Sequence, residues 1–137
     1  MNKIGFLKMA ILSLSLAGCA AAAPSPVDDG GYTNISVKTL EKMIEERRES
    51  FILVNTHIPF EGDIPGTDLS IPYDEILENL DKFPQEKDAE IVLYCRNDPM
   101  SNAAAADLVQ AGYSNVKNLV GGFNAWREAG QPLEMVP

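Results

Sequence analysis

Of the side chains that could do chemistry in this sequence, a cysteine stands at the position that most favours reactivity. The chain has two cysteines, Cys19 near its start and Cys95 in its second half. Cys95 directly follows the apolar run Ile91–Tyr94 and precedes a segment typical of a helix start. A cysteine there faces unpaired backbone N–H groups and the positive end of a helix dipole, and both stabilise a thiolate. Cys95 is therefore predicted to be a nucleophile. The alternative is a small, inert core residue, because free cysteine is often buried.

The segment after Cys95 offers groups that could hold an anionic sulfur species. Asp98 followed by Pro99 is typical of an N-cap with proline at the first helical position. The backbone N–H groups of this segment can bind an anion, and Arg96 adds a mobile positive charge. The Asp98 carboxylate opposes both effects unless capping turns it toward the helix N–H groups. The predicted substrate-binding residues are Arg96, Asn97, Asp98, Pro99, Met100 and Ser101.

The single histidine, His57, is either a base or pH-sensitive group near Cys95, or an ordinary loop residue, which is the interpretation we favour. It has no companion ligands at metal-binding spacing, so the sequence predicts no metal site and no cofactor. Six positions after Cys95 stands Ser101, which excludes the Cys-x5-Arg loop of protein phosphatases and arsenate reductases.

Alternating strands and helices are predicted to position Cys95. Helices are predicted from the helical spacing of apolar residues and strands from short apolar runs, and Gly and Pro mark where each element ends. The predicted helices cover residues 36–48, 74–80, 103–111 and 123–129, and the predicted strands cover 51–54, 91–94 and 115–120. This order predicts an α/β fold with a mostly parallel sheet and helices on both faces. Ligands of such sheets gather at the carboxyl ends of the strands, where Cys95 and the loop of residues 55–66 are both expected.

The first residues are predicted to be a leader that is not part of the fold. Lys3 and Lys8 precede an apolar run, residues 9–16, that is too short to span a bilayer. The run ends in Leu16-Ala17-Gly18-Cys19, which resembles a bacterial lipoprotein signal whose cysteine is lipidated after cleavage. The alternative is an ordinary secretory signal cut near residues 21–23.

This pattern divides the chain into a signal peptide (1–18), a flexible tether (19–32) and a single folded domain (33–137). Either signal exports the protein, and a lipid on Cys19 would anchor it in the cell envelope. Ala20 after the cysteine suggests the periplasmic face of the outer membrane if the source is Gram-negative. With Cys19 lipidated, Cys95 has no intramolecular disulfide partner in a compartment where disulfides are common.

The net charge of −9 disfavours nucleic acid and anionic membrane surfaces as partners. Membrane contact is therefore expected through lipid on Cys19, and a protein partner in the envelope is a further expectation.

An ordered set of motifs after residue 33 resembles a rhodanese domain. The matching motifs are Leu53-Val54-Asn55, Gly62-Asp63-Ile64-Pro65-Gly66, Ile71-Pro72, Tyr94-Cys95-Arg96, Gly112-Tyr113, Gly121-Gly122, Trp126 and Ala129-Gly130. The resemblance implies a rhodanese-like fold in which Cys95 carries sulfane sulfur as a persulfide and passes it to a nucleophilic acceptor.

Departures from the family pattern fall close to Cys95. Asp98 replaces a glycine of the loop, and Met100 replaces an arginine that helps to bind anionic donors such as thiosulfate. Asn55-Thr56-His57 stands where the family has Asp-Val-Arg, and Asp63 replaces a histidine. These changes weaken the expectation of activity with thiosulfate, but they leave the persulfide-forming atom in place.

The sequence therefore predicts an envelope-anchored sulfurtransferase that takes sulfur from a small donor and passes it to a thiol, cyanide or sulfite. Two alternatives stay open. One is a catalytically weak module that binds a partner or carries sulfur, and the other is a single-cysteine redox sensor.

Overall fold

The computed structural model describes residues 30–135. The predicted signal peptide, the lipidation site Cys19 and most of the predicted tether lie outside the described residues. No helix within residues 30–135 is long and apolar enough to cross a membrane.

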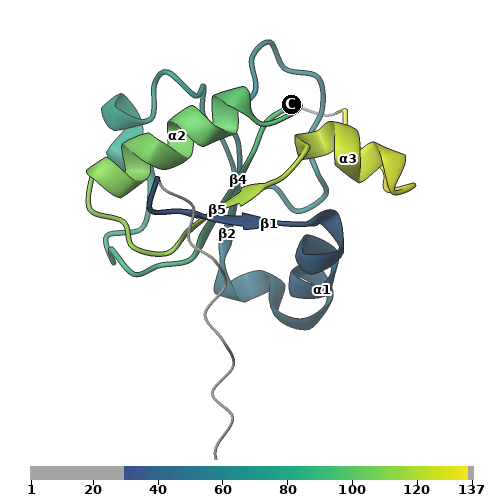
Figure 1. The fold of residues 1–137 in the computed structure, drawn as a ribbon, viewed down its shortest axis with the longest axis horizontal. Helices are drawn as coiled ribbons and strands as arrows, with labels where there is room; N and C mark the ends of the chain where they lie inside the picture. Colours follow the sequence, from purple (N-terminus) through teal and green to yellow (C-terminus); the bar gives the residue numbers. More distant parts are fainter. Residues whose placement is uncertain (1–29, 136–137) are drawn as a thin grey trace, which may run out of the picture.

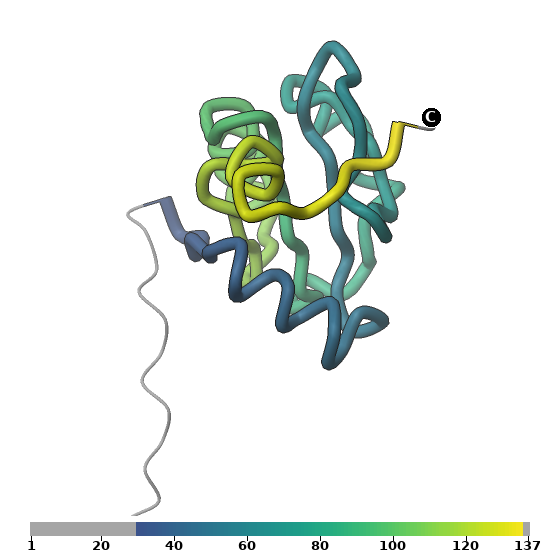
Figure 2. Tube along the Cα trace, turned by 90° about the vertical axis from the view of Figure 1, so that its right-hand side faces the viewer, coloured from purple at the N-terminus to yellow at the C-terminus, as the bar shows by residue number. Residues whose placement is uncertain are grey.

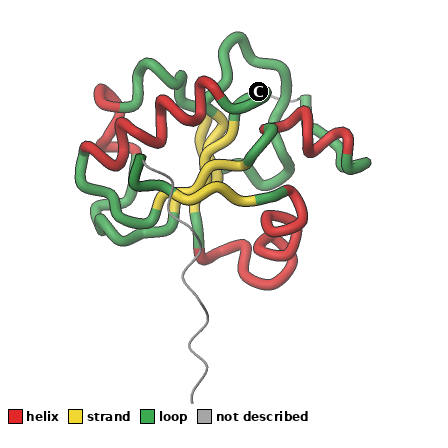
Figure 3. The backbone as a smooth tube through the Cα atoms, in the orientation of Figure 1, coloured by secondary structure: helices red, strands yellow, loops and turns green. Residues whose placement is uncertain are grey.

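A five-stranded parallel sheet forms the centre of the domain (Figures 1 and 3). Its strand order is β1-β5-β4-β2-β3, so that β4 lies in the middle. The strands are β1 (Thr33–Ile35), β2 (Ile52–Asn55), β3 (Leu69–Ser70), β4 (Ile91–Tyr94) and β5 (Val116–Leu119). All four strand pairings are parallel, which confirms the predicted α/β fold with a mostly parallel sheet.

Helices cover both faces of the sheet, as predicted (Figure 1). The α-helices are α1 (Val37–Arg47), α2 (Pro99–Gln110) and α3 (Gly122–Glu128), and short 3-10 helices cover Arg48–Ser50 and Leu77–Lys82. Ser36 begins α1, where its side-chain oxygen accepts a hydrogen bond from the Thr39 N–H.

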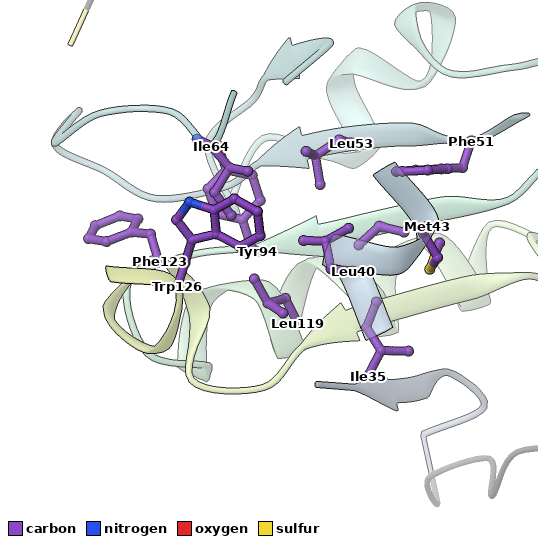
Figure 4. Packing of buried hydrophobic residues seen from close by; sticks show 11 residues of the cluster. Ile35, Leu40, Met43, Phe51, Leu53, Ile64, Tyr94, Leu119, Phe123 and Trp126 are labelled. Atoms are coloured by element: carbon purple, nitrogen blue, oxygen red, sulfur yellow. The ribbon is translucent and has the colours of Figure 1, made fainter. Parts of the chain in front are cut away.

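The alternation of side chains along β4 supplies both halves of the core. Ile91 and Leu93 pack into the cluster on the α2 face, whereas Val92 and Tyr94 pack into the cluster on the face of α1 and α3. Figure 4 shows the second cluster, in which Trp126 from α3 lies beside Tyr94. All four β4 residues are completely buried, as expected for a central strand of a parallel sheet.

Two details of the sequence-based prediction were wrong. The short edge strands β1 and β3 were missed, because their few residues carry little apolar pattern. The helix predicted over 74–80 is a 3-10 helix at Leu77–Lys82, interrupted by non-helical backbone angles at Asn79. Helix α2 begins at Pro99, as the predicted N-cap at Asp98 requires, and so includes the helical segment predicted over 103–111.

The chain after α3 runs across to the loop that follows β2 (Figure 2). The indole N–H of Trp126 in α3 donates to the Pro132 carbonyl of this segment at 2.8 Å. Asp63 and Glu134 then form an antiparallel bridge, with N···O distances of 2.8 and 2.7 Å. This segment therefore fastens the loop after β2 to the rest of the domain.

Candidate functional site

Cys95 lies directly after the central strand, at the edge of the sheet where α2 and α3 both begin (Figure 1). The residue is 1% exposed and forms no disulfide within residues 30–135. Its Sγ lies 3.1 Å from the backbone N of Asp98 and 3.3 Å from the Ser101 hydroxyl oxygen. The sulfur atom is thus held against the first turn of α2 by two groups able to donate hydrogen bonds to a thiolate.

The cysteine loop, residues 95–101, is also attached to the start of α3. The Phe123 N–H donates to the Cys95 carbonyl at 2.9 Å, and the Asn124 N–H donates to the Arg96 carbonyl at 3.1 Å. Gly122 makes this contact possible, because a Cβ at its position would overlap the Cys95 carbonyl oxygen at 2.1 Å. The first residues of α3 therefore form the platform on which the cysteine loop is built.

Asp98 has the predicted backbone position but an unexpected side-chain position. It is the N-cap residue of α2 with Pro99 next, as predicted, yet its carboxylate makes no capping hydrogen bond. Instead the carboxylate accepts hydrogen bonds from the Gly121 N–H at 2.8 Å and the Asn118 amide at 3.3 Å. The Asp98 backbone has φ +97°, a value that non-glycine residues rarely adopt. The two side-chain bonds stabilise this conformation, which directs the Asp98 N–H at Cys95.

Ser101 connects Cys95 to a buried polar network. Its hydroxyl lies 2.7 Å from the Asn118 side-chain oxygen, and both residues are buried. Because a hydroxyl has a single proton, Ser101 can donate to Asn118 while accepting from a Cys95 thiol, or donate to a Cys95 thiolate. The Asn118 amide also donates to Asn34 of β1 at 3.0 Å, so the network reaches the edge of the sheet.

The other predicted binding residues lie on the surface of the loop. Asn97 and Pro99 are exposed, Met100 is half-buried, and no hydrogen bond joins any of them to Cys95. The Arg96 side chain is 54% exposed and its nearest carboxylate is that of Glu61, at 3.7 Å. The structure thus brings Asp98 and Ser101 to the sulfur atom and leaves Arg96 at the rim.

His57 follows β2 in a loop, as favoured from the sequence, but it is buried beside the site. Its Nε2 pairs with Glu61, and its ring packs edge-on against Phe123 at a centroid distance of 5.2 Å. Its Nδ1 is buried without a hydrogen-bond partner among the described residues. The pairs His57–Glu61 and Glu61–Arg96 therefore join the loop after β2 to the cysteine loop.

The buried Tyr94 side chain holds the loop after β2 through hydrogen bonds of its hydroxyl group. Its hydroxyl accepts a hydrogen bond from the Ile64 N–H at 3.0 Å and lies 2.7 Å from the Thr67 hydroxyl. Burial raises the pKa of the Tyr94 phenol far above its ordinary value. The phenol therefore stays protonated and can donate to the Asp63 carboxylate at 3.2 Å.

Sequence reasoning did not assign functional roles to Asn118, Gly122 or Glu61. The available signal for Asn118 was its alternation with Val116 and Val120 on one face of the predicted strand 115–120, because an amide buried on such a face needs partners. No cluster of three or more His, Cys, Asp or Glu residues within residues 30–135 could hold a metal ion.

Comparison with known proteins connects this arrangement to a family. The family model described as the rhodanese-like domain matches residues 36–129. A sulfurtransferase of Allochromatium vinosum is 39% identical over 88 residues, which cover 62% of this chain and 79% of that protein. An uncharacterized Synechocystis protein is 32% identical over 104 residues, which cover 73% of this chain and 56% of that protein.

Solved structures share the fold. The rhodanese-like domain protein of Staphylococcus aureus superposes with a TM-score of 0.62 at 26% identity, covering 74% of this chain and 97% of that chain. Most of the curated relatives are longer proteins, of which this chain covers less than two thirds.

Proposed function

The chain belongs to the rhodanese-like domain family, and we propose that it transfers sulfane sulfur through a persulfide on Cys95. The observation that carries the proposal is the position of the Cys95 Sγ between the Asp98 N–H at 3.1 Å and the Ser101 hydroxyl at 3.3 Å. Both groups can stabilise negative charge on sulfur. They suit a thiolate before transfer and a persulfide anion after it.

The first half-reaction is a displacement at sulfur. The Cys95 thiolate attacks the outer sulfur atom of the donor and forms the Sγ–S bond. The bond between that sulfur atom and the rest of the donor breaks, and the leaving group takes its electron pair. With thiosulfate the leaving group is sulfite, so no external oxidant is needed.

The second half-reaction returns the enzyme to its starting state. A thiolate, cyanide or sulfite attacks the outer sulfur of the persulfide, and the electron pair of the Sγ–S bond returns to Cys95. The Asp98 N–H and the Ser101 hydroxyl stabilise the thiolate as it leaves. Arg96 assists the approach of an anionic donor from the rim.

The proposal includes attachment to the cell envelope. We infer that residues 1–18 are a signal peptide, that Cys19 carries lipid, and that residues 19–32 tether the domain of residues 33–137. The outer membrane's periplasmic face is the proposed location in a Gram-negative cell. Incorporation of a labelled fatty acid, lost in Cys19→Ser, tests this part independently of the chemistry.

Intact-mass spectrometry tests the sulfur transfer. The purified Cys19→Ser protein, in which Cys95 is the remaining thiol, is measured before and after incubation with thiosulfate, polysulfide or 3-mercaptopyruvate. A gain of one sulfur atom is expected, reversed by cyanide and absent from a variant that also carries Cys95→Ser. No gain with any of these donors would overturn the proposal and leave a binding module or a redox-sensing thiol as the working hypothesis.

A further inference from the structure

Asn118 is a buried amide on β5, the strand that pairs with the cysteine-bearing β4. It is 1% exposed, and neither half-reaction of the proposed sulfur transfer uses it. Its side-chain partners come from three segments: Asn34 of β1 at 3.0 Å, Asp98 of the cysteine loop at 3.3 Å and Ser101 of α2 at 2.7 Å. Both N–H groups and the oxygen of this amide are therefore engaged, as burial of an amide requires.

The Asp98 carboxylate decides which end of the Asn118 amide faces Ser101. A carboxylate accepts hydrogen bonds and donates none, so the Asn118 nitrogen must be the atom that faces Asp98. The other N–H of the same nitrogen donates to the Asn34 side-chain oxygen. The Asn118 oxygen is left for Ser101, and the Ser101 hydroxyl must therefore donate to it.

The single proton of the Ser101 hydroxyl has three acceptors within reach. These are the Asn118 oxygen at 2.7 Å, the Asp98 carbonyl oxygen at 3.1 Å and the Cys95 sulfur at 3.3 Å. While the proton lies on the Asn118 side, Ser101 presents a lone pair to Cys95, which suits a thiol and opposes a thiolate. If the hydroxyl turns to the sulfur, the buried Asn118 oxygen loses its donor, which costs free energy.

We propose that Asn118 is a positioning residue that restrains the ionisation of Cys95 by holding the Ser101 proton. In the resting state the Cys95 thiol donates to Ser101, and Ser101 donates to Asn118. When Cys95 ionises, the S–H bond breaks, the proton passes to a base in solution, and the Ser101 O–H turns to the sulfur. Because oxidants react with thiolates, this restraint protects Cys95 between cycles of sulfur transfer. The inference concerns the regulation of the same site, and its role in the reaction rests on the proposed function.

The Asn118→Leu variant keeps the approximate size of the side chain but removes the oxygen that holds the Ser101 proton. The hydroxyl can then donate to the Cys95 thiolate without leaving a buried acceptor unsatisfied. The rate of iodoacetamide alkylation at neutral pH, in the full-length chain with Cys19→Ser, is expected to rise about five- to tenfold. Asn118→Val, whose β-branched side chain suits a strand, is a second variant with the same expectation, and circular dichroism checks the folding of both.

The same substitution in a chain that also carries Ser101→Ala distinguishes the restraint from a loosened loop. Without the hydroxyl there is no proton for Asn118 to hold. Asn118→Leu is therefore expected to leave the alkylation rate of the Ser101→Ala chain unchanged within about twofold. Easier access of the reagent to Cys95 would instead accelerate alkylation in both backgrounds.

The ultraviolet absorbance of the Cys95 thiolate is a readout that does not depend on access of a reagent. It is measured as the difference between each chain and its Cys95→Ser counterpart, and it should increase at neutral pH in Asn118→Leu. Asn34→Ala is the matched control, because it removes a partner of the Asn118 nitrogen and keeps the oxygen that faces Ser101. It should change neither the absorbance nor the alkylation rate.

An alkylation rate that Asn118→Leu lowers or leaves unchanged would overturn the restraint. An equal rise in the Ser101→Ala background, or with Asn34→Ala, would overturn it as well. Sulfur gain from thiosulfate, followed by intact mass, is expected to accelerate together with alkylation. Alkylation that responds as expected, with no sulfur gained from any donor, would overturn the proposed sulfur transfer and leave the restraint of Cys95 standing.

Discussion

Gly122 lies directly against Cys95, so closely that a Cβ at Gly122 would sit 2.1 Å from the Cys95 carbonyl oxygen and 2.7 Å from the Arg96 carbonyl carbon. The next residue, Phe123, donates its N–H to the same Cys95 oxygen at 2.9 Å. The start of α3 and the cysteine loop therefore form one structural unit. Its shape depends on a glycine well separated from Cys95 in the sequence.

Substitution of Gly122 by alanine should displace the cysteine loop. The residue has φ +53°, which costs an alanine about 1–2 kcal/mol, and the overlap with backbone atoms adds about 1–3 kcal/mol more. Urea unfolding followed by circular dichroism measures the loss. Gly130→Ala is the matched control, because Gly130 also has positive φ but a Cβ there meets nothing within 4 Å. Equal losses in the two variants would show that the contact with Cys95 does not matter.

The anchoring of Asp98 should set the reactivity of Cys95. Asp98→Asn keeps an oxygen that can accept the Gly121 N–H and tolerates positive φ, whereas Asp98→Ala loses the anchor. Neither variant carries the charge, so their difference reports on anchoring alone. The rate of iodoacetamide alkylation at neutral pH, in a Cys19→Ser background, is expected to be about tenfold lower in Asp98→Ala than in Asp98→Asn, the equivalent of about 1.4 kcal/mol, because the Asp98 N–H is no longer held against the sulfur. Identical rates would contradict an anchoring role.

Removal of the Ser101 hydroxyl should affect both stability and sulfur chemistry. In Ser101→Ala the buried Asn118 oxygen loses its donor at 2.7 Å, which costs about 1–3 kcal/mol. The thiolate loses a donor at 3.3 Å, so alkylation at neutral pH should slow. Stopped-flow alkylation and urea unfolding check the two effects. Ser114→Ala, at an exposed serine, is the control. An alkylation rate unchanged by Ser101→Ala would show that the Ser101 hydroxyl does not stabilise the Cys95 thiolate.

Tyr94 should make the domain sensitive to alkaline pH. Burial raises the pKa of its phenol above the ordinary value of 10.0, so folding favours the protonated form. The stability that this provides is complete below pH 10 and is lost as the pH rises above it. Urea unfolding between pH 7 and pH 11 should show a shallower alkaline decline for Tyr94→Phe than for the original chain. At pH 7 the variant should be about 1–2 kcal/mol less stable, since the Ile64 N–H loses its acceptor. Parallel declines would rule out Tyr94 as the cause.

Much of the fold could be predicted because its strongest signals are local. The run Ile91–Tyr94 is apolar at every position, and the structure buries each of these residues at the centre of the sheet. The edge strands β1 and β3 were missed because an edge strand is defined by the neighbour to which it hydrogen-bonds. β1 pairs with β5, more than eighty residues later in the chain. The residue types of Thr33–Ile35 do not indicate that pairing.

The site was predicted in part. Cys95 at a strand end before a helix follows from the order of elements, and so does the N-cap position of Asp98. The direction of the Asp98 carboxylate does not follow, because its partners Asn118 and Gly121 come from β5 and the turn after it. The burial of His57 could not be predicted from the sequence either, because it depends on packing against Phe123 in α3.

The sequence by itself determined the order of the inner strands and the helices, the kinship with rhodanese domains and the position of Cys95 at the end of a buried strand. Each of these follows from residue types and spacings that are local in the sequence. The tertiary structure decided which groups surround that thiol: the Asp98 N–H and Ser101 hydroxyl at the sulfur, Gly122 beneath the loop, and Glu61 beside Arg96. Parallel strands bring their carboxyl ends to one edge of the sheet, so the surroundings of Cys95 come from segments far apart in the chain, whose contacts only folding creates.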